Sequence, residues 1–507
     1  HDQLRETAYA DLAGPERRSA HRDAARALEQ RAGSGSHELY PVLAHHWSMA
    51  DEPARAVEFL EKAGERALAM GAYQDTLDFL RRALAMSSRG VAVEPERRGR
   101  WQRWLGEAAW GLGDIDGCGG YFEAALAELD RPLPTSRAGW LRVTGRHVAG
   151  QLWRGMTRRA RPADHRAGEA ALAASRLSYR HYHGGDNLAM IALNLRSVAL
   201  ADRAPATAAV ATPYWQLGYL AGIVGMPRVA AHYYGHARGR ARATADDTSL
   251  AMSLYSEASY LIGAGHLGEA RRTAREAVDV LRRIGHVHEL EVALTVAAHA
   301  EHDLGEHRTA LALCRELYES SRERHNRMHE AWGAYTTARE LLALGEPDDA
   351  VVLCAHAAPL ALEAGDRASM VLLGGLRALA EVQRGRHAAA RDALDEWLGR
   401  VDGTMPAVWS LGHGYVAAAR CALALIDHTG DDAARARARA AVSHLWRHAL
   451  VFPVTRPAAL ACEARLAHRA GRTTVARWLA GEALARAQAQ AMPGDARDAA
   501  AVLAALA

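Results

Sequence analysis

Lysine is nearly absent from this chain of 507 residues, in which Lys62 is the only one. A Walker A loop needs a lysine followed by serine or threonine to hold the β- and γ-phosphates of a nucleotide, and Lys62 lies instead in Leu-Glu-Lys-Ala-Gly. Gly-x-Ser-x-Gly elbows and His-Glu-x-x-His zinc motifs are also missing. These absences exclude the commonest nucleotide-hydrolysing, serine-hydrolase and metalloprotease signatures.

Long apolar runs, β-branched residues and paired cysteines are scarce too. No run approaches the roughly eighteen residues that span a bilayer, and no signal peptide is recognisable, although the chain begins at His1 and we expect it to be a fragment. The five cysteines are odd in number and widely spaced, which predicts small buried side chains in a reducing cytoplasm. They are Cys118, Cys314, Cys354, Cys421 and Cys462.

A glycine recurs every forty residues in the second half of the chain, and each is followed five positions later by alanine. The glycines are Gly225, Gly265, Gly305, Gly345 and Gly385, and the alanines are Ala230, Ala270, Ala310, Ala350 and Ala390. Apolar residues three and four apart flank each glycine, which is the spacing of one buried helix face. A fixed period of this length predicts stacked helical hairpins, with the glycine in a left-handed turn and the alanine at a close helix contact.

The array extends beyond these five units. Gly185 lies forty residues before Gly225, Gly430 and Gly471 follow Gly385 at spacings of 45 and 41, and Gly71 and Gly113 open similar units upstream. We therefore predict an all-α fold, a right-handed superhelical solenoid of tetratricopeptide-like hairpins with a period near 40 residues. Such a solenoid escapes the size limit of a single core because each unit contacts only its neighbours.

Two patterns resemble ligand sites: a glycine motif that the repeat explains better, and histidine pairs that are better explained as chance spacing of solvated or hydrogen-bonded histidines. Gly263-Ala-Gly265-His-Leu-Gly268 matches a dinucleotide fingerprint, but Gly265 belongs to the forty-residue ladder and no strand precedes it. Histidine pairs four apart, His325 with His329 and His444 with His448, could supply two zinc ligands on one helix face, but no third ligand is evident. We therefore nominate no catalytic residue, no cofactor-binding residue, no metal ligand and no cofactor.

Arginine is concentrated between residues 137 and 166, where eight arginines face one acid, Asp164. Trp140, Leu141 and Val148 give this segment an apolar side. The pattern predicts a basic connecting helix; a weak contact with an anionic membrane surface or a partner is the alternative. The whole chain carries a net charge of only +3, so we expect no nucleic-acid partner.

Aromatic side chains cluster in one repeat, at Tyr214, Trp215, Tyr219, Tyr233 and Tyr234. They could line a ligand-binding face of the superhelix, but filling the interface of a helical hairpin is the favoured interpretation.

Several packing motifs resemble those of bacterial signalling ATPases. The end of their winged-helix part is similar to His1 to Leu12 together with Pro15-Glu-Arg-Arg and His21. The start of their tetratricopeptide-like region is similar to Leu43-Ala-His-His-Trp47 together with Ala56 to Ala67. Further motifs resemble the branch that joins a class III adenylate/guanylate cyclase, an AAA-type ATPase and a long helical tail: Asn194 to Ala201, Tyr233-Tyr234 and Ala331-Trp-Gly333. The resemblance implies that catalytic, ATP-binding domains lie upstream of His1.

These observations predict four segments: 1–34, the end of a winged-helix or ATPase-associated segment; 35–130, N-terminal repeats; 131–168, the basic connecting helix or linker; and 169–507, the C-terminal solenoid. We expect a non-catalytic, cytoplasmic interaction and regulatory region whose partner is another protein or its own upstream cyclase and ATPase domains, with no transmembrane segment. The alternatives are the sensor tail of an ATPase-type helix-turn-helix transcription regulator and a free-standing repeat scaffold.

Overall fold

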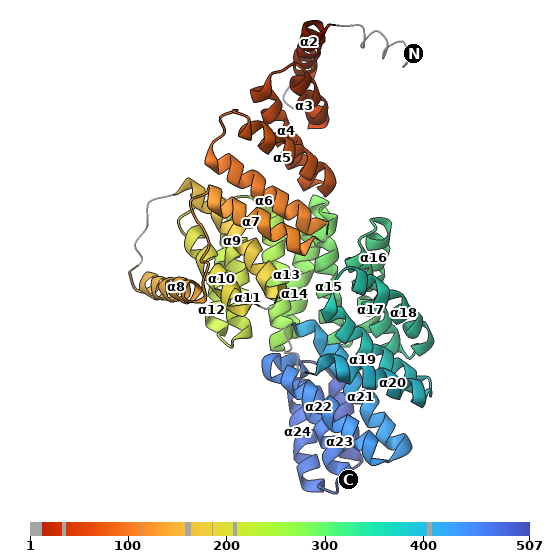
Figure 1. Ribbon diagram of the computed structural model, residues 1–507. Helices are drawn as coiled ribbons and strands as arrows, with labels where there is room; N and C mark the ends of the chain where they lie inside the picture. Colours follow the sequence, from red (N-terminus) through yellow and green to blue (C-terminus); the bar gives the residue numbers. More distant parts are fainter. Residues whose placement is uncertain are drawn as a thin grey trace, which may run out of the picture. The chain divides into compact units, whose positions relative to one another are not determined.

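The computed structural model describes residues 13–32, 37–112, 114–157, 164–184, 186–205, 210–402 and 408–506. Helices follow one another through all of these ranges, and no strand occurs in them (Figure 1). Successive helices pack as antiparallel hairpins, which is the tetratricopeptide-like arrangement. The prediction of an all-α solenoid of helical hairpins is confirmed.

The glycine ladder occupies the turns that the sequence predicts. All five glycines have positive φ, from 74° at Gly385 to 85° at Gly265. At Gly265 the amide nitrogen donates to the Ile262 carbonyl over 2.9 Å, and that of His266 donates to the Leu261 carbonyl over 2.8 Å. This pair of bonds closes the end of a helix, and a residue without Cβ adopts the left-handed conformation at least cost. Gly113 and Gly185 lie outside the described residues.

A second series of left-handed residues lies midway between the ladder glycines, and only some of its members are glycines. Gly285 and Gly365 have φ of 70° and 68°, and Ala245 and His325 occupy the same register with φ of 51° and 55°. The true turn spacing in this region is therefore twenty residues. Each forty-residue unit contains two helices that both end in a left-handed residue.

The ladder alanines lie where paired helices approach each other. Ala230, Ala270, Ala310, Ala350 and Ala390 are all fully buried. Their small side chains allow the two helices of a hairpin to pack closely, as predicted.

The described residues fall into two compact units, His1–Pro213 and Tyr214–Ala507, which we call unit 1 and unit 2. The helices of unit 1 are α2 (Gly14–Ala32), α3 (Tyr40–Met49), α4 (Pro53–Ala69), α5 (Tyr73–Ser88), α6 (Pro95–Gly111), α7 (Ile115–Glu128), α8 (Arg137–Thr157), α9 (His165–Gly184) and α10 (Asn187–Ala201).

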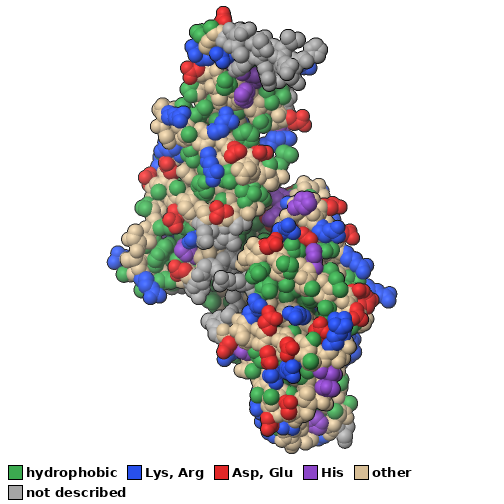
Figure 2. Space-filling model, turned by 45° about the vertical axis from the view of Figure 1, so that its right-hand side comes forward, with side chains coloured by type: hydrophobic (Ala, Val, Ile, Leu, Met, Phe, Trp, Pro, Cys, Tyr) green, Lys and Arg blue, Asp and Glu red, His purple; other side chains and the backbone are tan. Residues whose placement is uncertain are grey.

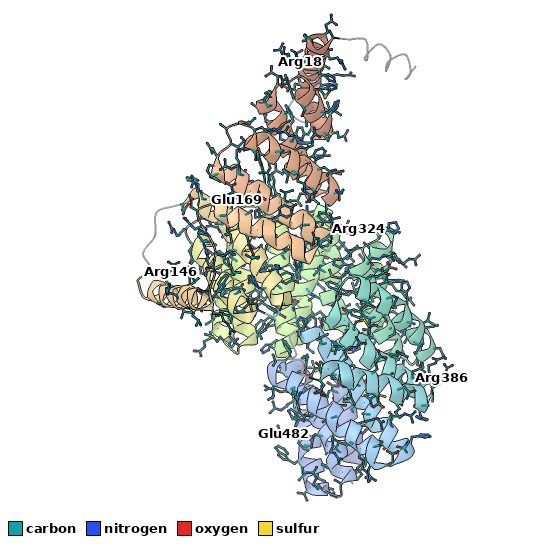
Figure 3. All side chains as sticks on the ribbon, viewed as in Figure 1. Arg18, Arg146, Glu169, Arg324, Arg386 and Glu482 are labelled. Atoms are coloured by element: carbon teal, nitrogen blue, oxygen red, sulfur yellow. The ribbon has the colours of Figure 1, made fainter. Side chains whose placement is uncertain are left out.

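A buried ion-pair cluster ties α9 to α6 inside unit 1 (Figure 3). The Glu169 carboxylate accepts from Arg100 Nε over 2.8 Å and from Arg103 Nε over 2.7 Å. Burial alone would raise the pKa of Glu169, but Arg103 and Arg100 bring it below its ordinary value. Glu169 is therefore ionised and paired in the folded protein.

The predicted basic helix is present as α8, which packs against α10. Arg146, labelled in Figure 3, is exposed on it, and so are Leu141 and Val148, at 61% and 42% of their surface. The contact with a membrane surface stays a prediction, as does the four-segment division of the chain. Residues 1–12, which carry part of the family resemblance, lie outside the described residues.

Unit 2 continues the hairpins along the chain. Its helices are α11 (Thr212–Ile223), which begins at the boundary, α12 (Pro227–Ala243), α13 (Asp247–Ala264), α14 (Leu267–Ile284), α15 (Val287–Asp303), α16 (His307–Glu323), α17 (Arg327–Leu344), α18 (Pro347–Glu363), α19 (Arg367–Gln383), α20 (His387–Val401), α21 (Gly412–Thr429), α22 (Asp432–Val451), α23 (Arg456–Arg469), α24 (Thr473–Ala489) and α25 (Pro493–Ala504).

The odd-numbered helices from α13 to α23 form the inner layer of unit 2, because each contacts the next odd-numbered helix as well as its hairpin partner. The last hairpins return to the first ones. Pro493, at the start of α25, lies against Gly305, and Gln490 lies against Gly265. Trp409 and Phe452 belong to the same core as α13 and α15. The inner helices and α25 therefore surround a common space.

Two further predictions concern core residues. All five cysteines are buried, and burial raises the pKa of the Cys354 thiol to about 12. Tyr214 and Tyr234 are buried, and Tyr234 packs against Ala230 in a small core, which agrees with the interpretation of the aromatic cluster as hairpin filling. Among the described residues, none of the helices has both the length and the apolar character to cross a lipid bilayer.

Candidate functional site

The inner helices of unit 2 enclose a pocket of about 260 Å³ with charged walls. Its lining comes mainly from α15, α17, α19, α21 and α25, and the lining residues run from His302 to Asp498 in the sequence. The wall carries acids and bases in equal number: Asp303, Asp495 and Asp498, with Arg339, Arg420 and Arg497. The outer surface in Figure 2 likewise shows interspersed acidic and basic side chains. The pocket differs because three of its charged side chains, Asp303, Arg339 and Asp495, are buried.

A buried carboxylate, Glu340, organises one wall of the pocket from α17. It is fully buried and accepts from Arg339 Nε over 2.8 Å. His302 Nδ1 lies 2.9 Å from both of its oxygens, and His307 Nδ1 lies 3.1 Å from one of them. Burial alone would raise the pKa of Glu340, but His302 and Arg339 bring it well below its ordinary value. Glu340 thus holds His302 in a fixed orientation.

A second carboxylate, Asp303, follows His302 at the end of α15 and bonds across the pocket to α21. His413 Nε2 lies 2.9 Å from Asp303 Oδ1, although the two residues are 110 positions apart in sequence. The other oxygen, Asp303 Oδ2, is buried and has no hydrogen-bond partner in the described structure. An unpaired buried carboxylate oxygen is costly, because it loses water and gains nothing in return.

Two histidines of α15 near the Asp303 carboxylate, His299 and His302, have lowered pKa values. Burial lowers the pKa of His302 to about 4, and that of His299 lies well below its ordinary value for the same main reason. The ring of His413 lies 4.9 Å from that of His302 and 5.0 Å from that of His299, measured between centroids. At neutral pH His302 and His299 therefore carry no positive charge, and the Nδ1 of His299 accepts a hydrogen bond from Arg339.

The opposite wall is an ion-pair cluster between α21 and α25. Arg420 lies 2.9 Å from Asp495 Oδ1 and 2.8 Å from Asp498 Oδ2. Burial raises the pKa of Asp495 to about 6 even beside this guanidinium. The pairing fixes the first turn of α25 against α21 and so holds the pocket closed on this side.

Another polar cluster, around Glu291 of α15, is structural. Glu291 is fully buried and accepts from Ser320 Oγ over 2.7 Å, while His329 Nδ1 lies 2.7 Å from its other oxygen. Arg324 lies 3.5 Å away, and His329 stacks on Trp332. Every oxygen of this carboxylate is paired, and none of these residues lines the pocket.

The histidine pairs singled out by their spacing do not form ligand sites. His325 has φ of 55° in the turn before α17, whereas His329 lies inside α17, so the expectation that they share one helix face is wrong. His444 and His448 do share α22, but His448 is bonded at both nitrogens: Nδ1 lies 3.0 Å from Thr455 Oγ1, and Nε2 lies 3.2 Å from the Val408 carbonyl. Burial lowers the pKa of His448 to about 4.

The glycine motif at Gly263, Gly265 and Gly268 joins two helices. Gly265 ends α13, Gly268 is the second residue of α14, and Gly263 lies against Phe452 and Trp409 in the core. A phosphate-binding turn requires a strand before the glycines, and here α13 takes that place.

No pocket residue was nominated from the sequence, because the pocket has no local signature. Asp303, His413 and Asp495 are brought together only by the return of the last hairpins onto the first ones. One signal in the sequence could have indicated the pocket: polar residues on a helix of the inner layer, as in His299-Ala-Glu-His-Asp303. A purely structural repeat would place apolar residues there.

Comparisons with known proteins add similarity of architecture. No protein-family model matches the chain, and no curated protein matches it in sequence. Solved structures do match. A Rap protein complexed with competence and sporulation factor is 11% identical with a TM-score of 0.45, over 89% of this chain and 98% of that chain.

The apo form of RapI is 13% identical with a TM-score of 0.43, over 55% of this chain and 98% of that one. Aspartyl phosphate phosphatase F from Bacillus subtilis is 10% identical with a TM-score of 0.43, over 78% and 93% of the two chains. At these identities and scores, the similarities do not indicate what this chain binds.

Proposed function

We propose that this chain is a non-catalytic regulatory module that binds a segment of another polypeptide in the charged pocket of unit 2. The observation that carries the proposal is a pocket in a repeat fold that is lined by three acids and three arginines, with Arg497 and Asp498 exposed at its rim. Burying the other charges is costly even though they are paired, and the hairpins themselves need only alanine and leucine to pack.

The dimensions and charges of the pocket fit part of a polypeptide. A volume of about 260 Å³ is below the range usual for drug-sized ligands, so the pocket would hold one or two side chains or a chain end. Because the pocket walls carry both positive and negative side chains, they favour a peptide segment that also carries charges of both signs. Arg497 is exposed at the rim, where it can contact such a segment without first breaking a buried pair.

Selection of peptides from a random library on the whole chain tests this proposal. Peptides enriched on the wild-type protein should bind at least tenfold more weakly to the Arg497→Glu variant, since the change reverses one rim charge. The control is Arg386→Glu, the same change at an exposed position that does not line the pocket (Figure 3). Equal binding to wild type and both variants, or failure to enrich any peptide, would contradict the proposal.

We further propose that this module belongs to a cyclase–ATPase signalling protein and that pocket occupancy biases its enzymatic domains. The support is the resemblance of packing motifs, whose members Leu43, Ala44 and Trp47 are buried as packing residues should be. Five buried cysteine thiols fit the cytoplasm as its location. Regulation requires the ligand to bind two states of the protein with different affinity.

The test uses the full-length cyclase–ATPase protein to which this proposal assigns the chain. Its nucleotide cyclase and ATPase rates should change when residues 1–507 are deleted. Unchanged rates and unchanged nucleotide dependence would refute regulation by this module, while leaving peptide binding by the pocket untouched.

A further inference from the structure

Three groups of side chains in unit 2 hold three potential metal-ligand atoms within 4.8 Å of one another. Two of them are already saturated. In the first, His288, Glu291 and His329, both carboxylate oxygens accept from neighbouring side chains. In the second, His302, His307 and Glu340, the carboxylate oxygens already accept from Arg339 and from both histidines.

The third group, His302, Asp303 and His413, has unused coordinating capacity. Asp303 Oδ2 is buried without a partner, and the three residues line the pocket, which connects them to solvent. Because His302 Nδ1 is engaged by Glu340, its free nitrogen is Nε2. We propose that His302, Asp303 and His413 bind one Zn²⁺ ion, with a fourth position open to the pocket.

The donor set suits this ion. Two imidazoles and one carboxylate with an open fourth position are a common zinc arrangement in proteins. Tetrahedral ligands at about 2.1 Å from zinc stand roughly 3.4 Å apart, so closing the site from 4.8 Å requires shifts on the order of one ångström. Rotation of the histidine rings can supply such shifts.

Two features of the surroundings support a cation here. Glu340 accepts from the nitrogen of His302 that faces away from the site, which is how carboxylates orient zinc-binding histidines. Asp303 is the last residue of α15, at the negative end of the helix dipole, where a lone carboxylate is disfavoured and a cation is favoured. The inference does not depend on the peptide-binding proposal.

The test is calorimetric titration of ZnCl₂ into metal-free protein without a histidine tag, with MgCl₂ as a second titrant. Wild type should bind one zinc ion and no magnesium. Asp303→Asn and His413→Gln should each weaken zinc binding at least tenfold; both are close in shape to the native residue and can keep a hydrogen bond. Thermal melts of the metal-free variants check that they are folded.

Two further variants make the assignment specific. His468→Ala removes an exposed histidine of α23 outside all three groups, and zinc binding should be unchanged. His307→Ala should also leave it unchanged, because His307 belongs only to the saturated group around Glu340. Loss of zinc binding in His307→Ala with retention in His413→Gln would overturn the assignment, and so would a wild-type protein that binds no zinc.

Discussion

Replacing Gly345 by alanine adds one atom, a Cβ, and so tests whether the turn after α17 requires a left-handed backbone. Gly345 ends α17 with φ of 84°, and a Cβ added there would meet no atom within 4 Å. The change therefore introduces backbone strain without a steric clash. The left-handed conformation costs an L-residue roughly 1–2 kcal/mol, partly offset by the smaller entropy of alanine in the unfolded chain, so we expect a net loss of about 1 kcal/mol.

The matched control is Gly235→Ala, the same chemical change inside a helix. Gly235 lies in the middle of α12, is exposed, and has no atom within 4 Å of its would-be Cβ. Alanine is the better helix former by roughly 0.5–1 kcal/mol, so this variant should be more stable than wild type. The two substitutions are thus expected to have opposite signs.

Hydrogen–deuterium exchange is the suitable assay, because a repeat array opens locally and a single midpoint averages over its units. Amides that exchange by local opening of α17 and α18 should exchange roughly fivefold faster in Gly345→Ala, as a change of about 1 kcal/mol implies. Amides of α12 should exchange more slowly in Gly235→Ala. A neutral or stabilising Gly345→Ala, or equal signs at both positions, would refute the reasoning.

Three further changes test other parts of the structure. Ala245→Gly should stabilise α12 and α13 by about 0.5–1 kcal/mol, measured by the same exchange assay, because alanine there has φ of 51°; faster exchange would contradict the twenty-residue register. Ala310→Phe should cost about 1–3 kcal/mol in urea unfolding by overpacking a fully buried helix contact, and an unaltered midpoint would show that the site has room. Glu169→Gln should cost about 3 kcal/mol, the lower end of the range for breaking a buried pair, since Arg103 keeps Glu107. Because the pKa of Glu169 is lowered on folding, its stabilisation is complete above about pH 5 and is lost as the pH falls, so the cost of Glu169→Gln should shrink in acid; a cost independent of pH would argue against the ion pair.

The repeat could be predicted from sequence because each unit is built from local contacts. Glycine at a helix end and alanine at a helix crossing are chosen by their own backbone and nearest neighbour, so Gly345 and Ala350 reveal a hairpin without knowledge of the rest. The twenty-residue spacing of the turns could not be seen in the glycine pattern, because alanine and histidine, not glycine, occupy two of the left-handed positions, 245 and 325. A left-handed residue with a side chain leaves no trace in a glycine pattern.

The pocket could not be predicted in the same way. Asp303 meets His413 across 110 residues and Arg420 meets Asp495 across 75, and both contacts depend on the small rotation accumulated from hairpin to hairpin. Spacing along the sequence instead drew attention to His325 and His329, which a left-handed turn separates. Local rules therefore predict the units of such an array, and only its accumulated curvature determines which distant side chains meet.

A double-mutant cycle on Asp303 and His413 tests most directly whether the array returns on itself around the pocket. Asp303→Ala, His413→Ala and the double variant would be compared in metal-free buffer by their free energies of unfolding. Side chains 2.9 Å apart should show a coupling energy of about 0.5–3 kcal/mol. Additive effects, with coupling below about 0.3 kcal/mol, would mean that α15 and α21 do not share a pocket and would contradict the account.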